Sequence, residues 1–433
     1  MKIIESSRGR GITVSAINTT KFKRNTVQLS FILPRNEDTV SCAAILSATL
    51  MRGCKRYGSV TAIGRALCGL YNAGLSIHSQ PYGDILLFHV NSSMLDDKYA
   101  FDGGEIFGGV LELISELLLH PLTDGEALKY AYVESEKKRR VDMIRAEINN
   151  KDRYALIRAD EIAFKGTPLA IRCTEEAVLA VTAESAYRLL LDMISTAPLM
   201  ISVSGDITRD KERALDRFIE LISEKRSDEI TEFRGIHACV PEREIPETVM
   251  EKAVAKQGRM VLSYSMKKCG RGDAAPMIFD EIFGSSPVSR LFMNVRERLS
   301  LCYYCSSRAS RVTGRMLVRS GLDLESRDMA IEEIERQLAL LCDPENITDE
   351  ELENAKLARI STFISMEDDP EGCLTWYQTS KLAGLEESNG ELIEAIKAVT
   401  REAVSEVARS VRLQLSYFLD GNGEEPANDE NEE

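Results

Sequence analysis

Residues 282–304 read IFGSSPVSRLFMNVRERLSLCYY, and this stretch decides how the rest of the chain is interpreted. A turn of small residues at 284–287 leads into an expected helix, which carries Leu291 and Val295 on one side and several arginines on the other. An apolar and aromatic strand is expected over residues 299–304. A turn, a basic amphipathic helix and a strand in this order predict an arm that presents charge beside a cleft.

Composition describes an ordinary globular protein. The chain has 433 residues, of which 44% are hydrophobic and 28% are charged, so two domains of about 200 residues each are expected. The net charge of −15 argues against a nucleic acid or an anionic membrane as the main partner. No apolar run is long enough to span a bilayer, and the N-terminus lacks the apolar core of a signal peptide. With ten scattered cysteines, reduced thiols in the cytoplasm are the expectation.

The first half of the chain alternates strands and helices. Residues 27–33 alternate between apolar and polar side chains, which predicts a half-buried strand. Residues 41–51 are apolar almost all round, which predicts a buried helix. Ser59 is expected to cap a second helix, and residues 75–79 and 85–90 are expected to form a pair of strands. A long helical stretch is also expected over residues 126–164.

The second half repeats this order. In both halves a helix is followed by a short loop, a Thr-Asp pair and another helix, with Thr123-Asp124 in the first half and Thr348-Asp349 in the second. Each half also ends in a strand and a glycine turn, at residues 204–206 and 416–421. The repetition favours two similar α+β domains from one duplicated unit, each a mostly antiparallel sheet with helices packed on one face.

The predicted boundaries follow from this repeat. They give an N-terminal domain over residues 1–231, a linker over 232–246 and a C-terminal domain over 247–421. Residues 422–433 are acidic and predict a disordered tail.

The opening stretch resembles the "G…SRLF…VRE…LAY" signature found in the C-terminal domain of the pitrilysin (insulinase) family of zinc peptidases. Residues 289–292, 295–297 and 302–303 match that signature in order and spacing, and residues 348–356 and 368–370 also fit the family pattern. The resemblance runs from about residue 27 to residue 421. It implies two domains of the LuxS/MPP-like architecture.

Active members of that family carry His-x-x-Glu-His on the helix after the first strand. Two histidines four residues apart lie on one helix face and bind zinc together, and the glutamate activates water. Aligned on this chain, the motif falls on residues 44–48, where both histidine positions are alanine (Ala44 and Ala48) and the glutamate position is Ser47. The third ligand position falls on Met143 or, in a competing alignment, on Glu147. The resemblance therefore predicts a scaffold with no metal, no cofactor and no catalytic residue of its own.

Other metal-ligating residues do not replace the lost motif. The four histidines, at positions 78, 89, 120 and 237, form no pair at helical spacing, and each is expected to be a surface or core residue. Cys302 and Cys305 lie three apart on an expected strand, so their side chains are expected to point to opposite faces and not to share a metal.

Arg296 and Tyr303 are the candidate substrate-binding residues. In active relatives the matching arginine and tyrosine reach the substrate near the zinc, so the resemblance implies peptide contacts here. The alternative is that Arg296 pairs with a neighbouring carboxylate and Tyr303 packs.

Short chains of the family work in pairs, and some pairs combine one zinc-bearing chain with one that lacks zinc. The resemblance therefore implies a non-catalytic subunit that pairs with a zinc-bearing paralogue and encloses a peptide substrate, while a homodimer is also open. Among such chains it resembles the bacterial group associated with aminopentanol modification of elongation factor P. The alternatives are a stand-alone peptide-binding or scaffold protein and, less favoured, an active peptidase with an unrecognised site.

Overall fold

The computed structural model describes residues 3–237 and 240–421, so the predicted acidic tail lies outside the described residues. The chain forms two compact units that are not continuous in sequence. The first unit comprises residues 1–145, 171–236 and 366–382, and the second comprises 146–170, 237–365 and 383–433. The compact units therefore cross the boundaries predicted at residues 231 and 247. Each unit includes a helix from the opposite half of the sequence.

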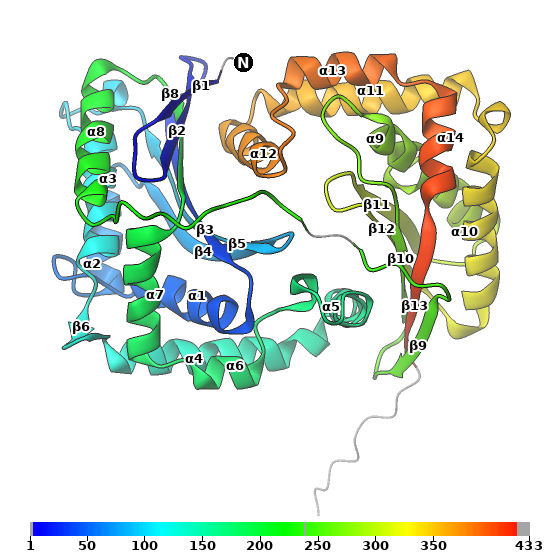
Figure 1. Ribbon diagram of the computed structural model, residues 1–433, viewed down its shortest axis with the longest axis horizontal. Helices are drawn as coiled ribbons and strands as arrows, with labels where there is room; N and C mark the ends of the chain where they lie inside the picture. The colour runs from blue at the N-terminus through cyan, green and yellow to red at the C-terminus, as the bar shows by residue number, and fades with distance from the viewer. Residues whose placement is uncertain (1–2, 238–239, 422–433) are drawn as a thin grey trace, which may run out of the picture. The chain divides into compact units, whose positions relative to one another are not determined.

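A six-stranded sheet forms the centre of the first unit, with strand order β1-β2-β8-β3-β5-β4 (Figure 1). Strands β2 and β8 are parallel, and the other neighbours are antiparallel. The predicted strand and strand pair are confirmed in position, but β3 is buried on both faces and not half-buried as predicted, because α12 packs on the face opposite the core. The bounds are β1 Ile4–Ser7, β2 Ile12–Asn18, β3 Arg24–Pro34, β4 Gly74–Tyr82, β5 Ile85–Leu95 and β8 Leu199–Gly205, and a separate small ladder joins β6 Thr123–Asp124 to β7 Ala127–Leu128.

Most helices of the first unit cover one face of this sheet. The apolar residues of β3, Val27, Leu29 and Phe31, are fully buried in a core shared with Ile45 and Leu46 of α1. The cap predicted at Ser59 is present, since its hydroxyl accepts a hydrogen bond from the backbone of α2. The bounds are α1 Glu37–Leu50, α2 Val60–Gly69, α3 Ile106–Leu119, α4 Tyr130–Arg145, α6 Glu175–Ala180, α7 Ala183–Thr196, α8 Arg209–Ser223 and α12 Pro370–Leu382, with a 3₁₀ turn at Asp97–Tyr99.

The second unit repeats the sheet with five strands in the order β11-β12-β10-β13-β9. Read from β9, its pairings match those of β2-β8-β3-β5-β4, including one parallel pair, β9 with β13. This shared topology confirms the predicted α+β fold of two duplicated units. The bounds are β9 Glu247–Lys252, β10 Gly258–Ser265, β11 Tyr304–Ser310, β12 Arg315–Leu322 and β13 Arg412–Asp420.

Helices and short helical turns complete the second unit. Two π-helical turns, at Glu281–Ser285 and Phe292–Arg298, take up nearly half of residues 282–304. The helix bounds are α5 Lys151–Ala163, α9 Ala275–Asp280, α10 Arg327–Leu341, α11 Asp349–Met366, α13 Asn389–Ala398 and α14 Arg401–Ser410, with 3₁₀ turns at Ala146–Asn149, Pro168–Ala170, Leu324–Ser326 and Pro344–Asn346.

The two exchanged helices, α5 and α12, each lie on the sheet face opposite the main helical layer. In the second unit, Ala155, Ala159 and Ala163 of α5 pack without exposed surface against β10 and β13. In the first unit α12 packs against β8 and β3. The prediction of helices on one face therefore holds for the main layer, and a single helix occupies part of the other face in each unit.

Three local predictions were wrong. The strand predicted at 299–304 begins only at Tyr304 and continues to Ser310, because Ser300 adopts a left-handed conformation with φ of 50° that interrupts an extended chain. The long helical stretch at 126–164 is broken into α4, a 3₁₀ turn and α5. The Thr-Asp cap takes its predicted form only in the second half, where Thr348 caps α11. In the first half Thr123 and Asp124 lie in β6, and Asp124 accepts a hydrogen bond at 3.1 Å from the Tyr130 N–H at the start of α4. None of the helices within the described residues has the length and apolarity needed to cross a bilayer.

Candidate functional site

The residues at the metal-motif positions lie on α1 in the first unit. Asn36 caps this helix, since its side chain accepts a hydrogen bond from the Thr39 backbone at 2.8 Å. Ala44 and Ser47 are buried, Ala48 is half-buried, and the Ser47 hydroxyl donates to the Ala44 carbonyl oxygen at 3.0 Å. Two methyl groups and a hydroxyl that is bonded to its own helix thus stand where imidazoles and a carboxylate would be needed.

The two candidates for the third ligand position lie in different surroundings. Met143 is about half exposed on α4, and α4 contacts α1 within the first unit. Glu147 lies in the 3₁₀ turn after α4, in a segment that belongs to the second unit, and its carboxylate is 3.8 Å from Arg153.

A buried carboxylate that sequence reasoning did not assign lies on α4. Glu136 is only 3% exposed, and its oxygens lie 3.3 Å from Arg52, just after α1, and 3.5 Å from Arg139. Glu136 and Met143 are seven residues apart and therefore share a helix face, a spacing that could have identified the pair in the sequence. In this chain the buried Glu136 carboxylate is therefore paired with arginine guanidinium groups.

The residues at these positions do not fit a zinc ion. Within residues 3–237 and 240–421, no group of three or more histidine, cysteine, aspartate or glutamate side chains is arranged to hold a metal. A zinc site that activates water needs three protein ligands. The motif positions therefore supply none of the ligands that such a zinc site needs.

A cavity of about 390 Å³ lies beside α1 but does not coincide with the motif positions. Its walls include Asp38 and Cys42 of α1 and Ser185 and Arg188 of α7. Burial raises the pKa of the Cys42 thiol to about 11, so this thiol is neutral at physiological pH. A neutral, buried thiol is a packing group and not a nucleophile.

The two candidate substrate-binding residues, Arg296 and Tyr303, both belong to the second unit. Arg296, in the π-helical turn, is 40% exposed, lies over the Phe292 ring at 4.6 Å and pairs with Glu297 at 3.5 Å. Tyr303 is 58% exposed, and in the described residues its hydroxyl has no hydrogen-bond partner. The alternative was that Arg296 pairs with a neighbouring carboxylate and that Tyr303 packs. It describes part of the contacts of Arg296, whereas Tyr303 is open to solvent.

Local backbone geometry positions these two side chains. The left-handed Ser300 reverses the chain between them, and the Leu301 N–H donates to the Val295 carbonyl oxygen at 3.0 Å. The Tyr303 N–H then donates to the Gly321 carbonyl oxygen at 2.9 Å, which joins the segment to β12. A serine in this conformation costs on the order of 1 kcal/mol, and such strain together with π-helical turns often accompanies functional positions.

Cys302 and Cys305 form a thiol pair next to Arg296, contrary to the prediction that they face apart. Cys302 precedes β11, so the two side chains do not follow strand alternation. The hydrogen bond from the Cys305 thiol lowers the pKa of Cys302 to about 7, against the effect of burial, and the Ser320 hydroxyl and the Arg296 charge act in the same direction. The same contact and burial raise the pKa of Cys305 well above its usual range.

The face of the first unit's sheet that carries α12 is polar at its centre. Gln28 and Ser30 of β3 alternate with the core residues, and His89 of β5 and Ser202 of β8 lie on the same face. Within the described residues, several buried polar atoms of this face have no hydrogen-bond partner: Gln28 Oε1, Asn91 Oδ1, Ser202 Oγ, Ser204 Oγ, Gln378 Nε2 and Ser380 Oγ. Buried polar atoms are almost always satisfied, so this face is suited to water or a ligand.

His78 and His89 meet on this polar face, which their sequence spacing did not reveal. They are directly opposite each other in β4 and β5, with ring centroids 5.2 Å apart. Burial lowers the pKa of His89 to about 4, and burial also lowers the pKa of His78 while the charge of Glu371 opposes this. Both imidazoles are therefore neutral at pH 7.

Comparisons with known proteins agree with this description. Residues 180–359 match the family described as "Peptidase M16 inactive domain". The probable inactive metalloprotease YmfF of Bacillus subtilis (strain 168) is 26% identical over 420 residues, which cover 96% of this chain and 97% of YmfF. In fold, the chain is similar to a conserved protein from Enterococcus faecalis V583, with a TM-score of 0.86, 23% identity and coverage of 98% and 100% of the two chains.

A second solved structure, a peptidase M16 inactive domain from Pseudomonas fluorescens, has a TM-score of 0.75 and 15% identity, with the same coverage. These two structures establish the shared fold, and the family match and the relative add the inactive character. The chain is therefore similar, in sequence and in fold, to M16 (pitrilysin/insulinase-type) peptidases of the inactive kind, and it lacks the zinc motif at the aligned positions.

Proposed function

We propose that this chain is the non-catalytic subunit of an M16-type peptidase and that it pairs with a zinc-bearing paralogue to form a peptide-binding and processing chamber. One observation carries the proposal. Ala44, Ser47 and Ala48 offer no zinc ligand, while α1, α4 and the sheet around them are fully formed. A subunit of this kind shapes the chamber, and only the partner has to hold the metal.

The edge of the first unit's sheet supports a role in peptide binding. Strand β4 is the last strand of that sheet, pairs with β5 on one side only, and contacts α1. The main-chain groups on its free side are suited to an extended peptide, which would add to the sheet as a further strand. We propose that the peptide substrate binds there, beside α1.

Arg296 and Tyr303 support the same role in the second unit. Tyr303 is exposed, and its hydroxyl has no partner among the described residues, while the Arg296 side chain is partly open to solvent. Together they offer two donors for peptide carbonyl or carboxylate oxygens. We propose that they contact the substrate, and that the chain works in the cytoplasm, where its thiols stay reduced.

Co-expression tests the pairing directly. The chain is produced together with a paralogue from the same genome that carries His-x-x-Glu-His, and the mixture is separated by size-exclusion chromatography at micromolar concentration. We expect co-elution, about one zinc ion per pair and peptide cleavage that a chelator abolishes. Separate elution would contradict the proposal, and a peptide-binding homodimer without cleavage would favour the stand-alone alternative.

A matched pair of variants tests the role of Arg296. Replacing it by alanine is expected to lower kcat/KM of the assembled pair about 10-fold or more, which is the effect of one charge-assisted hydrogen bond. Arg308→Ala, an exposed arginine on β11, serves as the control and should leave kcat/KM unchanged. If both variants retain the activity of the wild-type pair, the proposed substrate contact is wrong.

A further inference from the structure

The polar face of the first unit's sheet brings together two imidazoles from neighbouring strands. His78 of β4 and His89 of β5 are partners in the antiparallel register, and their planes are tilted by 39° with ring centroids 5.2 Å apart. Two imidazoles bound at about 2.0–2.1 Å to a tetrahedral zinc ion have ring centroids about 5 Å apart. The observed separation therefore matches the one expected for two imidazoles that share a metal ion.

Hydrogen bonds orient the His89 ring for this role. Its Nδ1 lies 2.7 Å from Ser30 Oγ, and the Ser30 hydroxyl donates in turn to Gln378 Oε1 at 3.0 Å. With the serine proton directed to Gln378, the hydrogen bonds fit the tautomer in which His89 Nδ1 carries the proton and Nε2 has the lone pair. A ring held through Nδ1 by a second polar group, with Nε2 available, is the usual arrangement of a metal-binding histidine.

The surroundings of the two rings are polar and provide negative charge. Gln28 Oε1 and Ser202 Oγ on the same face are buried without a partner in the described part of the chain, so they do not pack as an apolar core would. Glu371, in the first turn of α12, lies close enough for its charge to act on His78. A carboxylate whose charge reaches His78 also balances part of the charge of a cation bound there.

We propose that His78 and His89 bind one divalent transition-metal ion, of the zinc or copper kind, on the polar face of the first unit's sheet. No third protein ligand is in place among the described residues, so water completes the coordination. Imidazole ligands select zinc, copper and nickel over magnesium and calcium. The ion cross-links the edge strand β4 to β5, on the face opposite the core that contains Ile45 and Leu46 of α1.

Isothermal titration of the untagged full-length chain tests this site. The protein is freed of metal with EDTA, dialysed and titrated with zinc chloride and, separately, with copper sulfate. We expect one ion per chain, and a loss of affinity of about 10-fold or more in His78→Ala and in His89→Ala. His120→Ala, an exposed histidine elsewhere in the first unit, is the matched control and should bind as the wild type does.

Two further measurements separate ligation from loss of structure. Ser30→Ala keeps both imidazoles but removes the support of His89, and is expected to weaken binding by about 10-fold. The copper-loaded protein should show coupling to two nitrogen nuclei in electron paramagnetic resonance, and to one in His78→Ala, which alters a half-buried residue and should leave the circular dichroism spectrum unchanged.

The outcomes are decisive in both directions. Stoichiometric binding that both histidine variants weaken supports the site. Binding that neither variant changes identifies a metal held elsewhere on the chain and overturns the proposal, as does the absence of heat at micromolar protein. The measurement uses this chain alone, so its result is independent of whether the chain pairs with a zinc-bearing peptidase subunit.

Discussion

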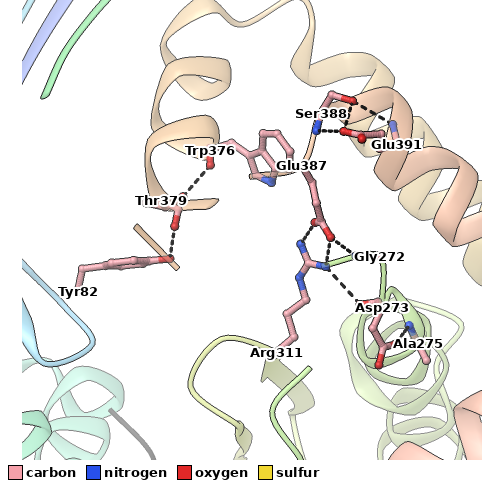
Figure 2. Close-up of polar contacts among 10 residues, drawn as sticks. All are labelled: Tyr82, Gly272, Asp273, Ala275, Arg311, Trp376, Thr379, Glu387, Ser388 and Glu391. Atoms are coloured by element: carbon pink, nitrogen blue, oxygen red, sulfur yellow. Dashed lines mark hydrogen bonds and ion pairs between the residues drawn. The ribbon is translucent and has the colours of Figure 1, made fainter. Parts of the chain in front are cut away.

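The buried ion pair between Arg311 and Glu387 holds two loops of the second unit together (Figure 2). The side chains are 6% and 1% exposed, and the Glu387 carboxylate accepts hydrogen bonds from both Arg311 and the Gly272 N–H. Arg311 also donates to the Asp273 carbonyl oxygen at 3.2 Å. The pair thereby joins the loop before α9 to the loop before α13.

Replacing Arg311 with methionine removes the cation and leaves the carboxylate buried. Breaking a buried pair from one side typically costs about 3–5 kcal/mol, because the remaining charge loses its compensation but stays desolvated. For a domain of about 200 residues this lowers the unfolding temperature by about 6–20 °C. The double variant Arg311→Met/Glu387→Met should recover most of the loss, since both charges are then gone.

The assay compares Arg311→Met, in the turn between β11 and β12, with a matched arginine from the loop before α9. Arg271 pairs with Glu391 at 2.7 Å, but both side chains are more than half exposed, so Arg271→Met should unfold as the wild type does. Thermal unfolding is followed by circular dichroism for the whole chain and by the fluorescence of Trp376, the single tryptophan, which belongs to the first unit. If Arg311→Met and Arg271→Met unfold at the same temperature, the reasoning from burial is refuted.

Three further predictions follow from buried or perturbed groups. Alkylation of Cys302 by iodoacetamide, measured by mass spectrometry, should rise as the pH increases through about 7, and Cys305→Ala should move this midpoint upward because the hydrogen bond that lowers the pKa is lost. Arg226→Ala should lower the free energy of unfolding by on the order of 3 kcal/mol in urea titrations, because Arg226 is buried and donates to three backbone carbonyl groups. Ala159→Leu should lower the free energy of unfolding by about 1–3 kcal/mol in the same assay, since Ala159 has no exposed surface between α5 and the sheet. The control variant Arg153→Leu, at an exposed position of the same helix, should leave the free energy of unfolding unchanged.

Helices and strands could be predicted from the sequence where the pattern of apolar residues extends over consecutive positions. The alternation at residues 27–33 gave β3 its buried face, and the apolar composition of residues 41–51 placed α1 in the core. The vacant positions 44, 47 and 48 followed from the alignment of that helix, and the burial of Ala44 and Ser47 agrees with packing as their present role.

Contacts between distant segments could not be predicted in this way. The alanine stripe of α5 identifies a face that packs closely, but nothing local indicates that its sheet is built from residues beyond 246. The pairing of His78 with His89 depends on the register that β4 and β5 adopt across their turn. The strand predicted at 299–304 was misplaced because a short apolar run does not reveal the left-handed turn at Ser300.

The two faces of the first unit's sheet differ in a way that bears on function. The face toward α1 is filled by an apolar core that stabilises the unit, whereas the opposite face leaves Gln28, Ser202 and Ser204 with buried polar atoms that have no partner among the described residues. Each such atom costs about 1–3 kcal/mol if it stays dry, and an apolar residue of similar size would avoid that cost. A chain that served only as a scaffold would be more stable with apolar residues at these positions. The polar face is therefore better explained by occupants that satisfy these atoms, water or a bound cation, than by packing alone.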